Sequence, residues 1–274
     1  VAQAHIQVGD VMAFMQYAML IVISFIMLSV MLIMVPRASV SAGRVVEVIE
    51  TESVIKDPEK PAVFDNELPV RGVVEFKDVS FRYPGASEYG LKNISFIARP
   101  GQTTAFIGSA GAGKSTVVNL LLRFYDVSSG CITVYNLDIR SVTQHDLRNK
   151  IGYVPQKSML FSGTIESNLI YADENADMDT IVKAAEVAQA MEFISAKQEG
   201  FNAEISQGGK NVSGGQNQRL SIARALVKKP EILILDDCFS ALDFKTDAAL
   251  RSALKTYSKN STVIIVAQRV GTVM

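Results

Sequence analysis

The sequence lacks tryptophan and holds only two cysteines in 274 residues. The missing tryptophan excludes nothing, but Cys131 and Cys238 stand far apart in apolar surroundings. Their spacing indicates neither a disulfide framework nor a metal site, and it suits a reduced compartment. Acidic and basic residues nearly balance, to a formal net charge of −1. This charge gives no indication that the chain binds nucleic acid.

Charge is also missing from one long stretch, because no charged residue stands between Asp10 and Arg37. The run from Val11 to Val35 consists of Val, Met, Ile, Leu, Phe and Ala, interrupted only by Gln16, Tyr17, Ser24 and Ser29. At about 1.5 Å per residue a helix of this length crosses a hydrocarbon core of roughly 30 Å. A signal peptide would need a basic start and a shorter run. A core helix would need protein on all sides, so we predict a membrane helix.

Two basic residues, Arg37 and Arg44, follow the apolar run. The positive-inside rule then places everything after residue 36 in the cytoplasm, and we expect an integral protein of the plasma or inner membrane. Residues 37–50 keep a helical pattern. Residues 51–70 are charged and hold three prolines, which is typical of a linker. We therefore predict a membrane helix with its extension at 1–50, a linker at 51–70, and a folded domain at 71–274.

The sequence pattern changes after Arg71, from a charged linker to alternating apolar and polar residues. "VVEFKDVSFRY", the turn "PGASEYG" and "LKNISF" predict two antiparallel strands. Helical patterns separate four further short apolar runs, which predicts an α/β fold with a mostly parallel sheet. These runs are "TTAFIG" at 103–108, "IGYV" at 151–154, "ILIL" at 232–235 and "TVIIVA" at 262–267. The region between Ser162 and Leu226 is mainly helical, with one helix face formed by Ile181, Ala185, Ala188 and Met191.

"GSAGAGKST" at 108–116 follows an apolar strand and precedes the helical "VVNLLLRF". Gly108, four residues, Gly113, Lys114 and Ser115 match the phosphate-binding loop. Glycines suit this loop because successive backbone N–H groups must curl around phosphate oxygens. Lys114 would reach the β- and γ-phosphates, Ser115 would bind Mg²⁺, and the helix N-terminus adds its positive end. The alternative, a glycine-rich turn, does not require the strand and the helix around it.

Two further motifs place carboxylates at the end of a strand and glycines at the start of a helix. "ILILDDC" at 232–238 reads as a fully buried strand that runs into two carboxylates, at the end of the sheet where such folds place their chemistry. One carboxylate there could hold a metal ion through water. "SGGQ" at 213–216 has the spacing of a capping box, so it could be only a helix start. A cap does not require Gly214 and Gly215, which suit close approach to a second phosphate.

The order of these motifs resembles the ATPase domain of an ABC transporter. The phosphate-binding loop is followed by "YVPQ", "SGGQ", "ILILDD" and finally "SALD" at 240–243. "LFSGTIESNL" at 160–169 resembles the exporter branch in particular. The apolar run and "RVVEVIE" resemble the last transmembrane helix of such an exporter and its cytoplasmic extension. The resemblance covers essentially the whole chain.

The resemblance implies a role for each matching residue. Tyr83 matches the aromatic that stacks on adenine, although an ordinary strand tyrosine is the alternative. Gln156 matches the glutamine that touches Mg²⁺ and links the site to the membrane domain, and its alternative is a turn residue after Pro155. Asp236 matches the carboxylate that holds Mg²⁺ through water. The implied ATP-binding residues are Tyr83, Gly108, Ser109, Ala110, Gly111, Ala112, Gly113, Lys114, Ser115, Thr116 and Gln156, and the implied Mg²⁺ ligands are Ser115, Gln156 and Asp236.

The resemblance also implies a partner. In the family two ATPase domains sandwich two ATP molecules, and the signature of each covers the γ-phosphate bound by the other. The matching signature residues are Ser213, Gly214, Gly215 and Gln216, with Val212 in place of a leucine. Asp243 matches the acidic residue of the loop that crosses to the partner subunit. We therefore expect ATP and Mg²⁺ as cofactors and a second exporter half as partner.

Three positions depart from the family pattern. Asp237 stands where the family has its catalytic glutamate, Gln268 replaces a histidine, and Gln207 replaces a glutamate. Asp237 is one methylene short, roughly 1.5 Å of reach, and a misplacement of about 1 Å can cost a hundredfold in rate. Gln268 cannot carry a proton, and losing a positioned acid or base costs about 10² to 10⁴ in rate. We expect Asp237 and Gln268 to occupy the catalytic positions of a slow site.

Weak hydrolytic residues beside an intact signature resemble the degenerate half of a heterodimeric exporter. The expected function is ATP-driven export of a drug-like or lipophilic small molecule, in contact with membrane lipid. A regulatory nucleotide-binding subunit that gates a partner is the alternative. A soluble ABC ATPase of DNA repair or translation is disfavoured by the membrane helix. The single apolar run and the end at "AQRVGTVM" predict that this chain is a fragment of a longer protein.

Overall fold

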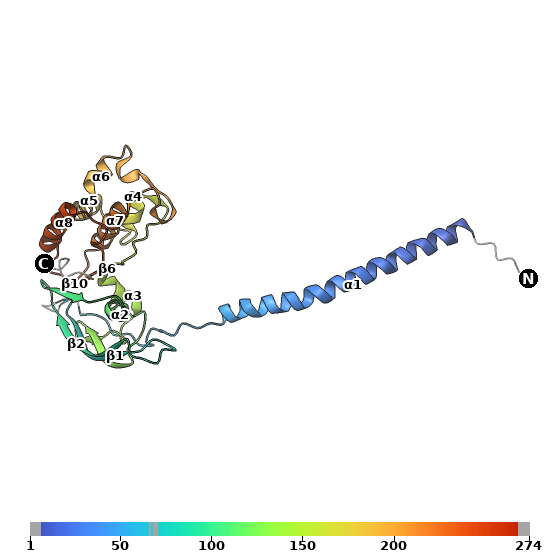
Figure 1. Cartoon of the computed structure of the whole chain (residues 1–274), viewed down its shortest axis with the longest axis horizontal. Coiled ribbons are helices and arrows are strands. Elements are labelled where there is room, and N and C mark those ends of the chain that lie inside the picture. Colours follow the sequence, from blue (N-terminus) through green and yellow to red (C-terminus); the bar gives the residue numbers. More distant parts are fainter. Residues whose placement is uncertain (1–6, 66, 68–70, 268–274) are drawn as a thin grey trace, which may run out of the picture. The chain divides into compact units, whose positions relative to one another are not determined.

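The computed structural model describes residues 7–65, 67 and 71–267. By its contacts the chain divides into two units, residues 1–54 and 55–274. Most of the described part of the first unit is the helix α1 (Val8–Ile49), drawn in blue in Figure 1. No side chain of α1 is buried, and its most apolar window has a mean hydropathy of 2.9. By length and composition α1 can cross a membrane, as the apolar run predicts.

The few polar side chains of α1 bond within the helix. The hydroxyl of Ser24 donates to the carbonyl oxygen of Leu20 at 2.8 Å, and the hydroxyl of Ser29 donates to that of Phe25 at 2.9 Å. Such bonds satisfy the hydroxyl donors where no water is available. The helix runs through Pro36 into the extension. The predicted helical pattern of 37–50 is therefore confirmed as far as Ile49.

The second unit contains an antiparallel sheet with the strand order β2-β1-β4-β5. Its first two strands, β1 (Val74–Phe81) and β2 (Leu91–Ala98), confirm the predicted pair. The sequence analysis did not predict the hairpin of β4 (Ser129–Val134) and β5 (Leu137–Asp138). Its two-residue turn is formed by Tyr135 and Asn136, both with positive φ, as a tight hairpin requires.

A parallel sheet has the strand order β3-β10-β9-β6. Its strands are β3 (Thr103–Ile107), β6 (Ile151–Val154), β9 (Ile232–Asp236) and β10 (Thr262–Ala267), which confirms all four predicted runs. Along β9, Ile232 and Ile234 pack into one core cluster while Leu233 and Leu235 pack into another. The strand is apolar without alternation because both of its faces are covered.

Short helices and a small two-stranded sheet make up the predicted helical region, and Figure 1 shows α4 to α7 at the end of this unit away from β1 and β2. The helices are α4 (Ile165–Ile170), α5 (Met178–Val187), α6 (Met191–Ser195) and α7 (Gly214–Val227). The small sheet pairs β7 (Gly163–Thr164) with β8 (Glu204–Ile205). Short 3₁₀ turns lie at Gly200–Asn202 and Gln207–Gly209. The other helices of the unit are α2 (Lys114–Leu121), α3 (Gln144–Asn149) and α8 (Phe244–Tyr257).

One detail of the helical prediction is wrong. Ile181 and Ala185 lie on α5, but Ala188 caps its C-terminus and Met191 begins α6. The break follows from Gln189, whose backbone has a φ of 56°. This left-handed conformation ends a right-handed helix. Ala188 is still buried and Met191 packs against the same core cluster. The apolar spacing therefore predicted which residues face the core, but not the break between the two helices.

Candidate nucleotide site

The loop at 108–113 joins the carboxyl end of β3 to the first turn of α2. Gly111 and Gly113 have φ values of 82° and 83°, which favour glycine. A Cβ at Gly113 would lie 2.8 Å from the carbonyl oxygen of Gly90 and 2.8 Å from the Cδ2 of Leu91. Glycine is required there both by the backbone and by the neighbouring start of β2.

Lys114 points back over this loop. Its Nζ donates to the carbonyl oxygens of Gly108 at 2.8 Å and Ser109 at 2.7 Å. The helix α2 begins at Gly113 with no side-chain cap. Its first N–H groups are therefore not taken up by a capping side chain and, together with the ammonium of Lys114, form a typical anion-binding arrangement.

Asp236 ends β9 directly opposite this loop. The side chain is 5% exposed and accepts a hydrogen bond from the Ser115 hydroxyl. Burial raises the pKa of Asp236 above its usual value, the Ser115 bond and the Lys114 charge lower it, and the neighbouring Asp237 raises it. A divalent cation at this point would relieve the desolvated carboxylate.

The donor set fits Mg²⁺ better than a softer metal. Among the described residues, no group of three His, Cys, Asp or Glu side chains gathers to form a protein-only metal site. The side chains of Ser115, Gln156 and Asp236 supply hydroxyl, amide and carboxylate oxygens, and all three line one cavity. Mg²⁺ is held by few protein oxygens and by substrate phosphates and water, so these residues suit a Mg²⁺-nucleotide.

Asp237 follows β9 with a left-handed backbone, at a φ of 47°. Its N–H donates to the carbonyl oxygen of Val266 at 2.9 Å. Its Oδ2 accepts a hydrogen bond of 3.1 Å from the Nε2 of Gln156, which lies after β6. Two sequence-predicted site residues that are 81 positions apart are thus brought together, since β6 and β9 are neighbours in the sheet.

A cavity of about 380 Å³ collects most of the predicted ATP-binding residues. Tyr83 lies at its edge, where the phenol shares a 3.0 Å hydrogen bond with the hydroxyl of Thr116. The rings of Phe81 and Tyr125 meet Tyr83 edge-on and hold it in place. The sequence analysis missed two lining residues, Gly90 and Val266, because nothing in their local pattern signals proximity to the loop. The full lining is Tyr83, Gly90, Ala110, Gly111, Gly113, Lys114, Ser115, Thr116, Gln156, Asp236, Asp237 and Val266.

The signature residues do not line this cavity. Ser213 is the N-cap of α7: its Oγ accepts from the N–H of Gln216 at 3.2 Å, and its N–H donates to the Oε1 of Gln216 at 3.0 Å. The predicted capping box is therefore present at the start of α7. A Cβ at Gly214 would meet nothing within 4 Å, whereas one at Gly215 would lie 3.2 Å from the carbonyl oxygen of Ala241. The cap leaves the glycine face open to an incoming group.

Asp243 is the N-cap of α8, where its Oδ1 accepts from the N–H of Thr246 at 3.0 Å. This backbone hydrogen bond holds the pKa of Asp243 below its usual value. The residue stands just after Ala241, the neighbour of Gly215, so the two predicted partner-facing segments meet. Gln207 lies in a 3₁₀ turn, and Gln268 lies outside the described residues.

Comparisons with known proteins agree with this geometry. A family model described as ABC transporter matches residues 91–240. YfiB, an ABC transporter ATP-binding protein of Bacillus subtilis, is 42% identical over 268 residues, covering 98% of this chain and 46% of that protein. The ATP-dependent lipid A-core flippase of Haemophilus influenzae is 42% identical over 218 residues, covering 79% of this chain and 37% of the flippase.

A solved structure of a bacterial Atm1-family ABC exporter with ATP bound matches with a TM-score of 0.80 and 34% identity, covering 100% of this chain and 47% of that chain. The chain thus spans less than half the length of the relatives that it matches, 46% of YfiB and 37% of the flippase. The chain therefore belongs to the ABC transporter family and carries its ATPase domain, homologous to those of exporters.

Proposed function

We propose that this chain is the ATP-binding and ATP-hydrolysing part of an ABC exporter half. The observation that carries the proposal is the cavity in which Lys114, Ser115 and Asp236 meet at the N-terminus of α2. An ammonium, uncapped helix N–H groups and a desolvated carboxylate together select a Mg²⁺-bound polyphosphate. Tyr83 supplies an aromatic face at the rim for the base.

The helix α1 supports a membrane location. Its side chains are exposed along its whole length, which is costly in water and favourable in lipid. Arg37 and Arg44 follow the apolar run, so the ATPase domain lies on the cytoplasmic side of the plasma or inner membrane. The similarity to a lipid A-core flippase and to an ABC exporter also supports a membrane location.

We further propose that the partner is a second, different exporter half and that this chain contributes the slower ATP site. Asp237 bonds to Gln156 with a side chain one methylene shorter than glutamate, and Gln268 replaces a histidine. The open Gly214, by contrast, suits the phosphate held by a partner. The cargo is lipophilic or drug-like, a proposal supported by the flippase among the relatives.

The first test is MgATP binding to the full-length protein, measured by titration calorimetry. Lys114→Ala should weaken binding about tenfold or more, since charge-assisted hydrogen bonds to phosphate contribute roughly 1.5–3 kcal/mol. Lys183→Ala, on the exposed face of α5, is the matched control and should bind as the unchanged protein does. Equal affinities of the Lys114 and Lys183 variants would remove the basis of the site.

A further inference from the structure

The C-terminal ends of α2 and α7 both form hydrogen bonds with Arg148, a residue of α3. Its Nε donates to the carbonyl oxygen of Leu122 and its Nη2 to that of Arg123, both at 3.1 Å, just beyond the C-terminus of α2. Lys228, the C-cap of α7, donates from Nζ to the carbonyl oxygen of Arg148 at 2.6 Å. A guanidinium at the end of α2 complements the helix dipole. The far ends of the phosphate-loop helix and the signature helix are therefore tied together.

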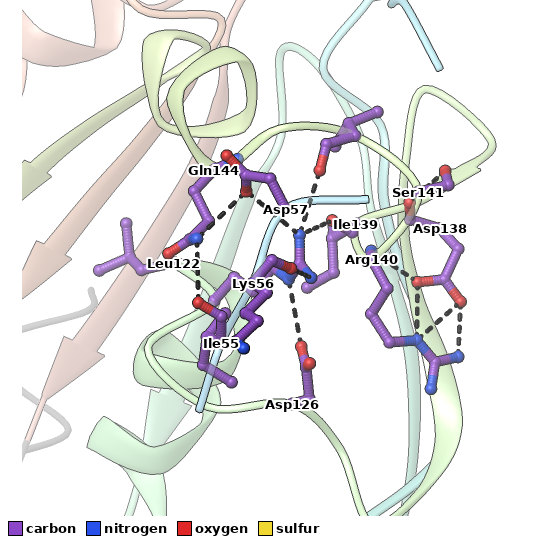
Figure 2. Close-up of polar contacts among 12 residues, drawn as sticks. Ile55, Lys56, Asp57, Leu122, Asp126, Asp138, Ile139, Arg140, Ser141 and Gln144 are labelled. Carbon is purple, nitrogen blue, oxygen red and sulfur yellow. Dashed lines mark hydrogen bonds and ion pairs between the residues drawn. The ribbon is translucent and has the colours of Figure 1, made fainter. Parts of the chain in front are cut away.

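The start of the linker is bound at the same place. Arg123 follows α2 and is 3% exposed. Its Nη2 donates to the carbonyl oxygen of Lys56 at 3.0 Å, and its Nη1 donates to the carbonyls of Ile139 at 3.3 Å and Val142 at 3.1 Å. Its Nε bonds to Asp126 at 3.2 Å. Figure 2 shows Lys56, Ile139 and Asp126 grouped around this network.

A second chain of hydrogen bonds runs from the linker to Arg148. The backbone N–H of Gln144 donates to the Oδ1 of Asp57 at 2.9 Å, and its Nε2 donates to the same oxygen at 3.1 Å. The Oε1 of Gln144 accepts from the Nη2 of Arg148 at 3.0 Å. The Gln144 bonds hold the pKa of Asp57 below its usual value, so the linker carboxylate stays ionised. Figure 2 shows Asp57 beside Gln144.

The backbone at Arg123 also favours a positional role. Its φ is 51°, a left-handed conformation that a long side chain adopts at a cost. The buried guanidinium fixes that conformation through contacts to the linker and to the segment before α3. A displacement of the linker therefore removes contacts from the residue that ends α2, the helix whose other end forms the phosphate loop.

We propose that Arg123 is a positioning residue that couples docking of the linker at Ile55–Asp57 to nucleotide binding at the phosphate loop. This rests on the proposed ATP binding. The linker joins the domain to the membrane helix. Through Arg123, a change in nucleotide occupancy at the phosphate loop would therefore alter how firmly the linker is docked. Coupling of this kind is reciprocal: if the docked linker strengthens nucleotide binding by some factor, bound nucleotide stabilises the docked linker by the same factor.

The reciprocity gives a quantitative test in the full-length protein. Hydrogen exchange of peptides covering residues 53–62 is measured with and without MgATP, and MgATP affinity is measured by calorimetry. In the unchanged protein MgATP should slow linker exchange about fivefold, within the usual range of coupling. Arg123→Ala should free the linker, weaken MgATP binding by about the same fivefold, and abolish the effect of MgATP on linker exchange. Arg123→Lys should recover part of each effect.

Two variants keep the test decisive if Arg123→Ala folds poorly. Asp57→Ala changes a linker side chain outside the cavity lining and should also weaken MgATP binding about fivefold. Arg140→Ala is the matched control because its guanidinium pairs with Asp138 and not with the linker, and it should change neither measurement. If Asp57→Ala and Arg123→Ala free the linker but bind MgATP as the unchanged protein does, the contacts are structural only and the proposal is overturned. The Lys114 comparison separates that outcome from a failure of the proposed ATP site.

Discussion

The phosphate loop and the signature both begin helices, but they begin them differently. Gly113 starts α2 with a left-handed backbone and no side-chain cap. Ser213 starts α7 with a reciprocal capping box. The loop thus leaves its first N–H groups to a ligand, whereas the signature satisfies part of its own and keeps an open glycine face. The difference supports our proposal that α2 holds the phosphate bound by this chain, whereas α7 meets a phosphate only when a partner brings one.

The largest effect should come from a charge on the open glycine face. A Cβ at Gly214 would meet nothing within 4 Å, so Gly214→Asp should fold normally and place a carboxylate where we propose that the partner's phosphate approaches. We expect about a hundredfold loss of phosphate release by the assembled transporter, as for loss of a group that stabilises transition-state charge. Asp237→Asn should lose less than about twofold. If Asp237→Asn is equally damaging, this chain's own site is a principal engine and the proposed asymmetry is wrong.

A gain of function would sharpen the same comparison. Asp237→Glu with Gln268→His should raise hydrolysis at this site about tenfold, because both groups act on one transition state. Asp237→Glu alone should raise it less than about threefold. The measurement is single-turnover hydrolysis by the pair whose partner carries an inactive site. Simple additivity of the two changes would contradict action on one transition state, and full recovery from Asp237→Glu alone would show that Gln268 is not limiting.

The capping box offers a smaller test. Ser213→Ala should lower the free energy of unfolding by about 1 kcal/mol and reduce phosphate release by the assembled pair. MgATP affinity at this chain's own loop should stay within about twofold. Asp177→Ala is the matched control, since Asp177 caps α5 through the N–H of Thr180. Asp177→Ala should lower the free energy of unfolding by a similar amount and leave phosphate release unchanged. If Asp177→Ala lowers phosphate release as much as Ser213→Ala does, Ser213 acts only as a helix cap.

The smallest effect concerns Asp236. Burial raises the pKa of Asp236 above its usual value of 3.8, so the folded chain binds this proton more tightly than the unfolded chain does. Stability is therefore lost as pH rises through the window between 3.8 and the raised pKa, and the loss persists above it. Asp236→Asn should raise the thermal midpoint by about 2 °C at pH 7 without Mg²⁺. The gain should vanish as pH falls below that window. A lower midpoint at pH 7 would mean that the Ser115 and Lys114 interactions outweigh burial.

The sequence predicted the parallel sheet and the phosphate loop because their signals are local. The aliphatic run of β9 predicts a buried strand, and the glycines at 108–113 predict a phosphate-binding loop, each from its own segment alone. The hairpin of β4 and β5 was missed since its short strands carry glycine, cysteine and threonine, and its turn residues are Tyr135 and Asn136. The contact of Arg123 with Lys56 spans 67 positions, and no periodicity predicts a pairing at that distance. Tertiary contacts of buried polar groups are the part that a single sequence leaves open.

The left-handed backbone at Asp237 has a consequence for how this position can change. Aspartate and asparagine adopt positive φ more readily than longer side chains, and glycine more readily still. The N–H bond to Val266 holds this conformation whatever residue stands there. A catalytic glutamate at this position would reach further, but its backbone would adopt the left-handed conformation at a small cost in free energy. The turn itself therefore favours aspartate over glutamate at position 237, independently of any demand from catalysis.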